Sequence, residues 1–361
     1  MITTRIFEAT GGKREAHVTI TVDDPMLPFI GQLCEVLRQY EEVKDSLGYN
    51  GYNMRPVFRR WFLSDSANQQ ALLPDGGECA TSVVEQPPLD LTKVALWVWL
   101  VQDAVVARGA DGIYSVEAFG HTHLFETGII RPGLGPREAM ASMLSDTDRA
   151  LVNRGGSLLG NCVRTWLFVR NVDLDYAEVV KGRNEAFQAL GLTPATRFIA
   201  STGIGGRQAD PSVAVAFDSY SILGLEEGRM QQISAPSHLN PTYEYGVAFE
   251  RATSVDYDDR RHLFVSGTAS IDNKGNIVWP GDIMRQTLRM IDNVRVLLET
   301  DSFDWDDVGQ MLVYLRDPAD YEVVSNIFEE WFGGSPFLIL LAPVCRLGWL
   351  VEMECMAMKK A

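Results

Sequence analysis

The sequence predicts an α+β protein built from three consecutive, related modules. The order strand, helix, strand, helix, strand, strand occurs in both the middle and the C-terminal third of the chain. Short segments also match between these parts: TWLFVRNVDLDY at 165–176 resembles MLVYLRDPADY at 311–321. Self-similarity of this kind is typical of a repeat architecture. We therefore expect modules at residues 1–106, 107–232 and 233–361; three unrelated α/β segments with the same local order are the alternative.

The first module is the weakest of the three copies. Apolar residues spaced by three or four predict a helix over residues 29–43. RRWFLSDSANQ at 59–69 aligns with the matching segments of the other modules and predicts a strand, followed by a shortened second helix over 66–73. VVEQPPLDLTKVALWVWLV at 83–101 aligns with LLAPVCRLGWLVEMECMAM at 340–358, the last strands of the chain.

The second module combines two helical stripes with three apolar segments. The stripes predict helices over 136–151 and 176–190. The short apolar segments predict strands at 162–169, 196–200 and 213–220.

The third module has the clearest pattern. Asp317 and Pro318 are typical of a helix start, as the N-cap and the first helical residue, and Gly333–Gly334 ends that helix. The other predicted elements are a strand at 263–265, a turn at 273–275, a helix at 284–298, and strands at 310–315, 336–344 and 350–358.

The composition excludes several classes of protein. The 361 residues include 32 Lys or Arg and 48 Asp or Glu, which gives a net charge of −16. Nucleic-acid binding depends on basic residues that neutralise phosphates, and no basic run here is longer than two residues. The longest apolar runs are about half of the ~20 residues that a membrane helix needs. Five scattered cysteines without a CxxC pair indicate a reducing compartment. We expect a cytoplasmic protein whose partners include neither nucleic acid nor membrane.

Reactive side chains gather near the end of the chain. Cys345 and Arg346 precede a predicted strand in which Glu352 and Glu354 share one face, because successive strand residues alternate. A carboxyl group in an otherwise apolar strand loses solvation, which raises its pKa and suits it to general acid–base chemistry. Arg346 is a candidate partner, and we expect it to depress the pKa of the Cys345 thiol. The alternative is a salt-bridged edge strand that faces solvent.

Residues 240–361 resemble the RidA/YjgF family, which is also called the endoribonuclease L-PSP family. The resemblance is carried, in order, by YGVAFERA, LFVSGTASID, QTLRMIDNVRVLLE, MLVYLRDPADY and WLVEMECMA. It implies a chorismate-mutase-like α+β fold that assembles as a trimer with ligand clefts between subunits. Three such modules in one chain would form a pseudo-trimer, either as a monomer or within a small homo-oligomer.

Within this superfamily the sequence is most similar to chorismatases. The matching segments are CRLGWLVEME at 345–354, RTW at 164–166, GR at 182–183 and VSGTASI at 265–271. The resemblance implies that Glu352 is the general acid that protonates the enol ether of chorismate, and that Cys345 lines the catalytic pocket. It implies a small anionic or carboxylated metabolite as partner, and no metal or organic cofactor. The implied substrate-binding residues are Arg346, Arg183, Arg164, Thr268 and Ser270.

Departures from both families leave alternatives open. Leu167–Phe168 replaces the Asn-Tyr pair of the chorismatase strand, and three modules exceed the two expected of chorismatases. RidA enamine deaminases hold the substrate carboxylate with an arginine, and Ile339 aligns with that position here. The alternatives are a RidA-type enamine or imine deaminase in which Glu352 orients water, and a non-catalytic metabolite-binding protein.

Two further motifs have ordinary explanations. His121, His123 and Glu126 place two imidazoles on one side of a segment, but a third metal ligand at conventional spacing is missing. We expect a polar strand or turn there. Ser201–Gly206 is either an anion-binding nest or, as we expect, a glycine turn. By the internal repeat it takes the place that CRLGW has in the third module, where it would line another cleft.

Overall fold

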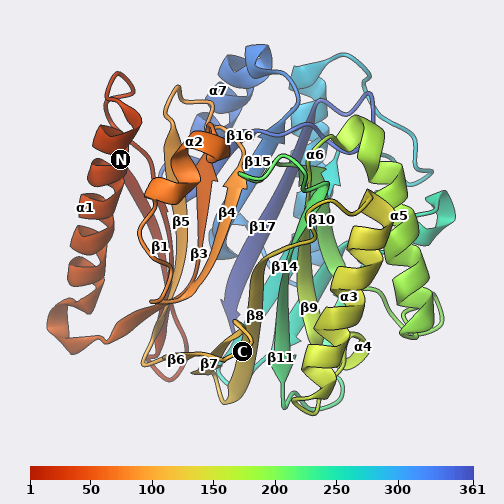
Figure 1. Ribbon diagram of the computed structural model, residues 1–361, viewed down its shortest axis with the longest axis horizontal. Coiled ribbons are helices and arrows are strands. Elements are labelled where there is room, and N and C mark those ends of the chain that lie inside the picture. The colour runs from red at the N-terminus through yellow and green to blue at the C-terminus, as the bar shows by residue number, and fades with distance from the viewer.

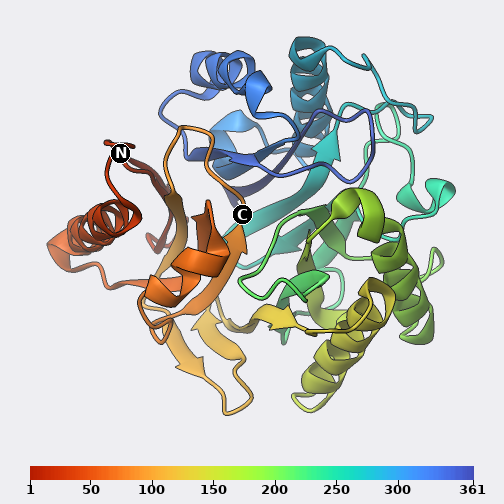
Figure 2. The same ribbon diagram turned by 45° about the horizontal axis from the view of Figure 1, so that its top comes forward.

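Three β-sheets surround a common centre, with helices on the outside (Figure 1 and Figure 2). The computed structural model describes the backbone of all 361 residues and every side chain except those of Asn50 and Tyr245. Each sheet comes from one consecutive part of the chain: residues 2–102, 105–223 and 230–360. The α+β class and the tandem modules expected from the sequence are confirmed.

The first module is a five-stranded sheet with the strand order β1-β2-β5-β3-β4. The predicted apolar stripe lies on its long helix, where Leu33, Val36, Tyr40 and Val43 are buried. The second helix is cut to one turn. The elements are β1 (Ile2–Glu8), β2 (Arg14–Ile20), α1 (Phe29–Gly48), η1 (Tyr49–Gly51), β3 (Met54–Leu63), α2 (Ser66–Gln69), η2 (Gln70–Leu72), β4 (Ala80–Glu85) and β5 (Val94–Gln102).

The second module repeats this order with one extra strand, β6-β7-β8-β11-β9-β10. The elements are β6 (Val105–Arg108), β7 (Tyr114–Ala118), β8 (His121–Ile130), α3 (Pro136–Val152), α4 (Leu158–Asn161), β9 (Cys162–Val169), α5 (Val172–Ala189), β10 (Ala200–Gly205) and β11 (Val215–Leu223).

The third module has the same order again, β12-β13-β14-β17-β15-β16. Asp317 caps its second helical segment as predicted, because its side chain accepts a hydrogen bond from Ala319 N. The elements are β12 (Met230–Ile233), η3 (Thr242–Tyr245), β13 (Ala252–Asp256), β14 (Arg260–Ala269), α6 (Ile283–Thr300), η4 (Trp305–Asp307), β15 (Val308–Leu315), η5 (Pro318–Asp320), α7 (Tyr321–Phe332), β16 (Phe337–Leu341) and β17 (Val351–Lys360). Since β6 and β12 cross the boundaries expected after residues 106 and 232, we propose that the modules meet within 103–104 and 224–229.

The expected glycine turn at 201–206 is wrong. Most of that segment belongs to β10, which pairs in parallel with β9, and the strand expected at 196–200 contributes only Ala200. The glycines allow close packing instead: a Cβ on Gly203 would lie 2.7 Å from the Tyr176 ring, and one on Gly205 would lie 2.6 Å from Pro343 of the third module. Small residues are therefore needed where α5 packs on its own sheet and where the second module meets the third, not where the chain reverses.

A buried ion pair joins each module to its neighbours. Every one of the six side chains is at most 3% exposed, and breaking such a pair by removing one partner typically costs about 3–5 kcal/mol. The pairs are Arg60–Asp218 at 3.0 Å (first and second modules), Arg164–Glu354 at 2.8 Å (second and third) and Arg260–Glu15 at 3.0 Å (third and first).

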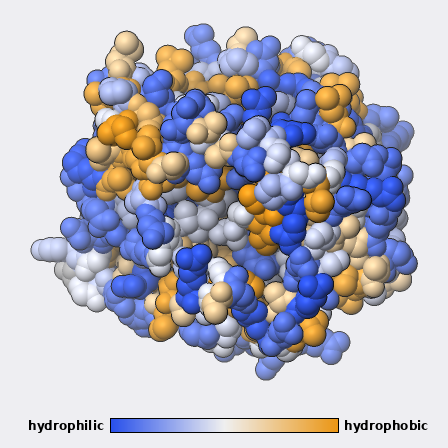
Figure 3. All heavy atoms as spheres, viewed as in Figure 1, coloured by the Kyte–Doolittle hydropathy of each residue, from blue (hydrophilic) through white to orange (hydrophobic). Residues whose placement is uncertain are grey.

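One apolar core extends through all three modules, with residues from β3, β5, β9, β11, β14, β15 and β17 packed together. Hydrophilic residues dominate the face seen in Figure 3, and hydrophobic residues occur among them in small groups. Within the described chain, every helix is too short or too polar to cross a bilayer.

Candidate active site

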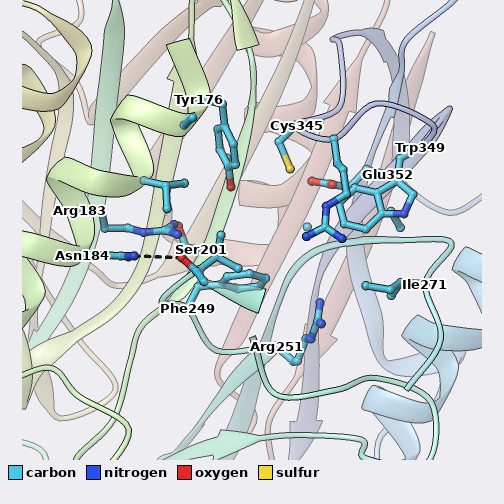
Figure 4. A pocket seen from close by; sticks show the side chains of 18 of the residues that line it. Tyr176, Arg183, Asn184, Ser201, Phe249, Arg251, Ile271, Cys345, Trp349 and Glu352 are labelled. Atoms are coloured by element: carbon cyan, nitrogen blue, oxygen red, sulfur yellow. Dashed lines mark hydrogen bonds between the residues drawn. The ribbon is translucent and has the colours of Figure 1, made fainter. Parts of the chain in front are cut away.

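A cavity of about 400 Å³ lies between the second and third modules (Figure 4). Helix α5 and strand β10 form one wall, and β14, the residues before β13 and the residues before β17 form the other. Arg183 and Asn184 enter from the α5 side, while Glu352, Trp349 and Arg251 enter from the opposite side. The lining holds four Lys or Arg side chains and a single carboxyl group. The cavity is therefore locally cationic in a protein with a net charge of −16.

Glu352 reaches the cavity from the interior of a sheet. Strand β17 lies between β14 and β15, so the alternative of a solvent-facing edge strand is wrong. The pairing of β14 with β17 shifts between Val265 and Thr268, which forms a bulge beside Glu352. Gly267 sits in this bulge, and a Cβ there would lie 2.1 Å from Oε1 of Glu352. The missing side chain thus leaves the space that the carboxyl group occupies.

Burial favours the protonated form of the Glu352 carboxyl group at neutral pH. The side chain is 4% exposed. Burial, followed by the charge of Glu354, raises the pKa of Glu352 to about 8, against the opposing effect of Arg251 and Arg164. Burial dominates because an ionised carboxylate loses its hydration in a low-dielectric interior. Glu352 can therefore donate a proton into the cavity near pH 7.

Arg183 supplies a buried positive charge to the same cavity. It is 2% exposed, and its Nε and Nη2 atoms have no hydrogen-bond partner among the described residues. Helix α5 can lie this close to α3 because Gly182 has no side chain: a Cβ there would lie 2.2 Å from the Arg137 carbonyl oxygen. Buried donors without partners are energetically costly, and a carboxylate accepts two parallel N–H bonds from a guanidinium group. The arrangement suits an anionic ligand.

Two more guanidinium groups lie on the third-module side. Arg251 donates from Nη2 to the Asn240 carbonyl oxygen at 3.1 Å. Arg346 stacks over the Trp349 ring at 4.8 Å, and Trp349 in turn donates from Nε1 to the Ser270 carbonyl oxygen at 3.1 Å. Hydrogen bonding and stacking thus hold both cations in place at the side of the cavity that carries Glu352.

Cys345 lines the cavity, but its thiol is not activated. Burial raises the pKa of Cys345 to about 12, and the charge of Glu352 adds to this effect. The expected depression of this pKa by Arg346 is therefore wrong, because desolvation of a thiolate outweighs one guanidinium group. The Tyr176 hydroxyl group interacts with the thiol, and burial raises the pKa of Tyr176 well above its ordinary value. Both groups keep their protons at neutral pH.

Three of the predicted binding residues do not line the cavity. Arg164 points into the junction between the modules, where it donates to Glu354 and to the Thr202 hydroxyl group. Thr268 donates to the Ser266 carbonyl oxygen, and Ser270 donates to that of Val278. Their side chains alternate away from the cavity or satisfy the backbone of nearby turns. The structure brings together Glu352, Cys345, Arg346 and Arg183.

Sequence reasoning missed several lining residues. From the sequence alone, Tyr176 belongs only to the helix predicted over 176–190, and Arg251 belongs only to the family-like segment YGVAFERA. Ser201 and Gly203 were expected to line another cleft, but they line this one. The internal repeat is the pattern that could have predicted these lining residues, because it places β10 of one module against β14 and β17 of the next.

The other sheets carry no carboxyl group where Glu352 stands. Val94, Val215 and Val351 each pair with the last residue of the neighbouring strand, Leu63, Val169 and Leu315. The next residue is then Ala95, Ala216 or Glu352. Only the third sheet therefore offers an acid at this register.

Ile339 does not face Glu352. It lies on β16 and lines a different cavity, between the third and first modules. The strand that faces Glu352 across the junction is β10, which presents Ser201 and Gly203. Neither strand supplies the arginine of an enamine deaminase.

The histidine motif at 121–126 lies in strand β8, as expected for a polar strand. Both ring nitrogens of His123 are engaged, Nδ1 with the Tyr220 hydroxyl group at 2.7 Å and Nε2 with the Ala118 carbonyl oxygen at 2.9 Å. Among the residues that the structure describes, no three His, Cys, Asp or Glu side chains gather as metal ligands.

Comparisons with known proteins agree with this architecture. The signature of the family described as endoribonuclease L-PSP matches residues 251–359. A RutC family protein of Pyrococcus abyssi is 35% identical over 100 residues, which are 27% of this chain and 79% of that protein. A RutC family protein of Pyrococcus horikoshii is 33% identical over 100 residues, with the same coverage. The crystal structure of a chorismatase superposes with a TM-score of 0.66 at 20% identity, and the match covers 86% of this chain and 94% of that one.

Proposed function

The chain belongs to the endoribonuclease L-PSP family, also called RidA/YjgF, and on this premise we propose that it is a chorismatase-like hydrolase or lyase. The active site is the cavity between the second and third modules. One observation carries the proposal: a buried Glu352, whose pKa is raised by burial, and a buried Arg183 with unpartnered N–H groups face the same space. The substrate is a small carboxylated enol ether of the chorismate type.

Arg183 binds one substrate carboxylate through Nε and Nη2, the two atoms without a protein partner. A second carboxylate lies near Arg251, on the opposite side of the cavity in Figure 4, or near Arg346, which stacks over the Trp349 ring. Phe249, Ile271 and Trp349 provide an apolar surface between these ends. Cations on opposite sides of an apolar surface suit a dianion with an apolar ring between its carboxylates. Such pre-placed charges orient the substrate before any bond changes.

Glu352 then acts as the general acid. It donates its proton to the methylene carbon of the enol ether, and the ether oxygen stabilises the cation that forms at the adjacent carbon. Water adds to that carbon, and the proton it releases returns to the Glu352 carboxylate. The resulting hemiketal collapses into a keto acid and an alcohol, so that the reaction consumes one water in total. Cys345 and Tyr176, both protonated, shape the wall beside the acid.

A RidA-type deaminase is the second candidate, because Glu352 also suits the orientation of water. The presence of Ser201 and Gly203, rather than an arginine, on β10 disfavours it. A protein that only binds metabolites is the third candidate. The unpartnered N–H groups of Arg183 are enough to support this third candidate, because ligand binding does not require an acid.

Incubation with chorismate, followed by chromatography for a hydroxylated diene or hydroxybenzoate product, tests the proposal. We expect turnover by the wild type and none by Glu352→Gln, which preserves the shape of the side chain but has no acidic proton. A coupled assay with 2-aminoacrylate tests the deaminase. If neither substrate is converted while chorismate raises the melting temperature, the protein is a binder.

A further inference from the structure

Glu354 is a buried carboxylate that the proposed reaction does not use. It is 2% exposed and lies outside the cavity. Arg164 Nη2 donates to its Oε2 atom at 2.8 Å, and Trp166 Nε1 donates to its Oε1 atom at 2.7 Å. Both donors belong to β9 of the second module. Each carboxyl oxygen of Glu354 therefore accepts a hydrogen bond from the second module, and one of the two donors is a cation.

Glu354 also lies close to the proposed acid. The two glutamates are two residues apart on β17 and point to the same side of the strand, about 6–7 Å apart along it. No bulge separates them, since their partners on β15 are the successive alternate residues Tyr314 and Leu312. Nothing in the strand therefore moves one carboxyl group away from the other.

The remaining charged or titratable groups around Glu352 do not favour its protonated form as Glu354 does. Tyr176, Tyr314 and Cys345 are neutral near pH 7, because burial raises the pKa of each. Arginine side chains favour the carboxylate form of a nearby acid. The groups that face Glu352 or its cavity from the packed elements are Tyr176, Lys181 and Arg183 of α5, Arg164 of β9, Arg251 before β13, Tyr314 of β15, Cys345 and Arg346 before β17, and Glu354 of β17.

We propose that Glu354 is a positioning residue for the proposed acid: hydrogen bonds from the second module hold its carboxyl group beside Glu352, and its negative charge favours the protonated form of Glu352. Without this charge, the charged neighbours of Glu352 would all be cations. Docking of the second module would then do two things at once, because β9 would hold Glu354 while α5 brings Arg183 to the cavity. The inference rests on the proposed function in one respect: the proposed reaction is what uses the proton of Glu352.

The chain contains a matched control. Asp218 of β11 occupies the same register as Glu354, pairs with Arg60 at 3.0 Å across the junction of the first two modules, and is equally buried. The residue two positions earlier is Ala216 instead of a glutamate. Asp218→Asn therefore disrupts a comparable ion pair without removing a charge beside Glu352.

The test measures the protonation of Glu352 in the full-length protein. The side-chain carboxyl carbons of glutamate are labelled with carbon-13, the Glu352 signal is assigned by its loss in Glu352→Gln, and its chemical shift is followed against pH. We expect a midpoint near 8 in the wild type, in line with the raised pKa. Glu354→Gln should lower it by roughly one to two pH units, as expected for one charge at this separation in a buried site. Asp218→Asn should leave it in place. An unchanged midpoint in Glu354→Gln, or an equal shift in Asp218→Asn, would overturn the proposal.

A second variant covers the case in which Glu354→Gln does not fold. Replacing a buried ion pair by apolar residues of similar volume is often tolerated, so Arg164→Met is combined with Glu354→Met. This change removes two opposing charges, of which Glu354 has the larger effect on Glu352. The midpoint should fall, but by less than in Glu354→Gln. A midpoint at or above the wild-type value contradicts the inference. Neither titration needs a substrate, so absence of chorismate turnover would refute the proposed function and leave this inference standing.

Discussion

Gly267 and Glu352 lie on neighbouring strands, and the carboxyl group of the glutamate fills the space that a side chain at position 267 would need. A Cβ at that position would lie 2.1 Å from Oε1, closer than any ordinary contact. The same glycine donates its backbone N–H to the Thr202 hydroxyl group of the second module at 2.8 Å. Movement of the Gly267 backbone away from Glu352 would break this hydrogen bond between the two modules. A side chain at position 267 therefore displaces the Glu352 carboxyl group instead.

Gly267→Ala should reduce turnover by about 100-fold while the protein stays folded, because an acid displaced by about an ångström no longer meets the carbon that it protonates. The measurement is kcat/KM on chorismate, together with the melting temperature. Gly77→Ala is the control, since nothing lies within 4 Å of its added Cβ. Full activity in Gly267→Ala would show that the position of Glu352 is unimportant.

Arg183→Met should weaken the binding of a carboxylated ligand by about 10- to 100-fold, the usual value of a charge-assisted hydrogen bond. It should not lower the melting temperature of the free protein, because it removes two buried donors that have no partner. Calorimetric titration and thermal unfolding measure the two effects. Arg137→Met, which breaks an exposed ion pair with Glu185, should change neither. A loss of stability without a loss of affinity would assign Arg183 to the scaffold.

Activity should decline as the pH rises through about 8. Burial raises the pKa of Glu352 to that value, and only the protonated form donates. The pH profile of kcat/KM reports this group in the free enzyme. A profile that rises above pH 8 would indicate that the reaction needs a base.

The same shift predicts a pH-dependent stability. Since the folded state holds the proton of Glu352 more tightly than the unfolded chain does, its contribution is fully present below the ordinary pKa of 4.5 and is lost as the pH rises through about 8. Glu352→Gln should therefore gain in free energy of unfolding relative to the wild type across this range. Denaturant titrations at either end measure it, and a constant difference between the two proteins would contradict the prediction.

Periodicity predicted most elements because each buries one face against its own module. The stripe of α1 and the cap at Asp317 are examples. The local sequence pattern did not predict contacts between residues of different modules. The glycines at 205 and 206 look like a turn, yet they permit contact with Pro343 of the third module and Val84 of the first. For the same reason the local sequence around Arg164, a residue expected to bind substrate, does not reveal its ion pair with Glu354, 190 positions later.

Stability should fall as the pH drops below 6.5. Burial lowers the pKa of His17 and of His123 from 6.5 to about 3. Between these values the unfolded chain binds protons that the folded protein does not bind. The loss should continue down to about pH 3. His123→Gln, which keeps a hydrogen-bonding side chain, should reduce the slope. Denaturant midpoints measured across this range provide the test, and identical slopes in the wild type and the variant would contradict it.

Each chain should bind one carboxylated ligand. The cleft between the third and first modules has a cavity of similar size, about 470 Å³, but its described lining holds the acids Asp90 and Glu329 and no Lys or Arg side chain. Ala95 and Ala216 stand where Glu352 does in the third sheet. An anion placed there would meet acids instead of guanidinium groups, which disfavours binding. Calorimetry with chorismate and Glu352→Gln, which does not consume it, should give one site. Arg183→Met should weaken that site without revealing another. A stoichiometry of two or three would mean that the pseudo-threefold arrangement, and not the side chains of one junction, determines where the ligand binds.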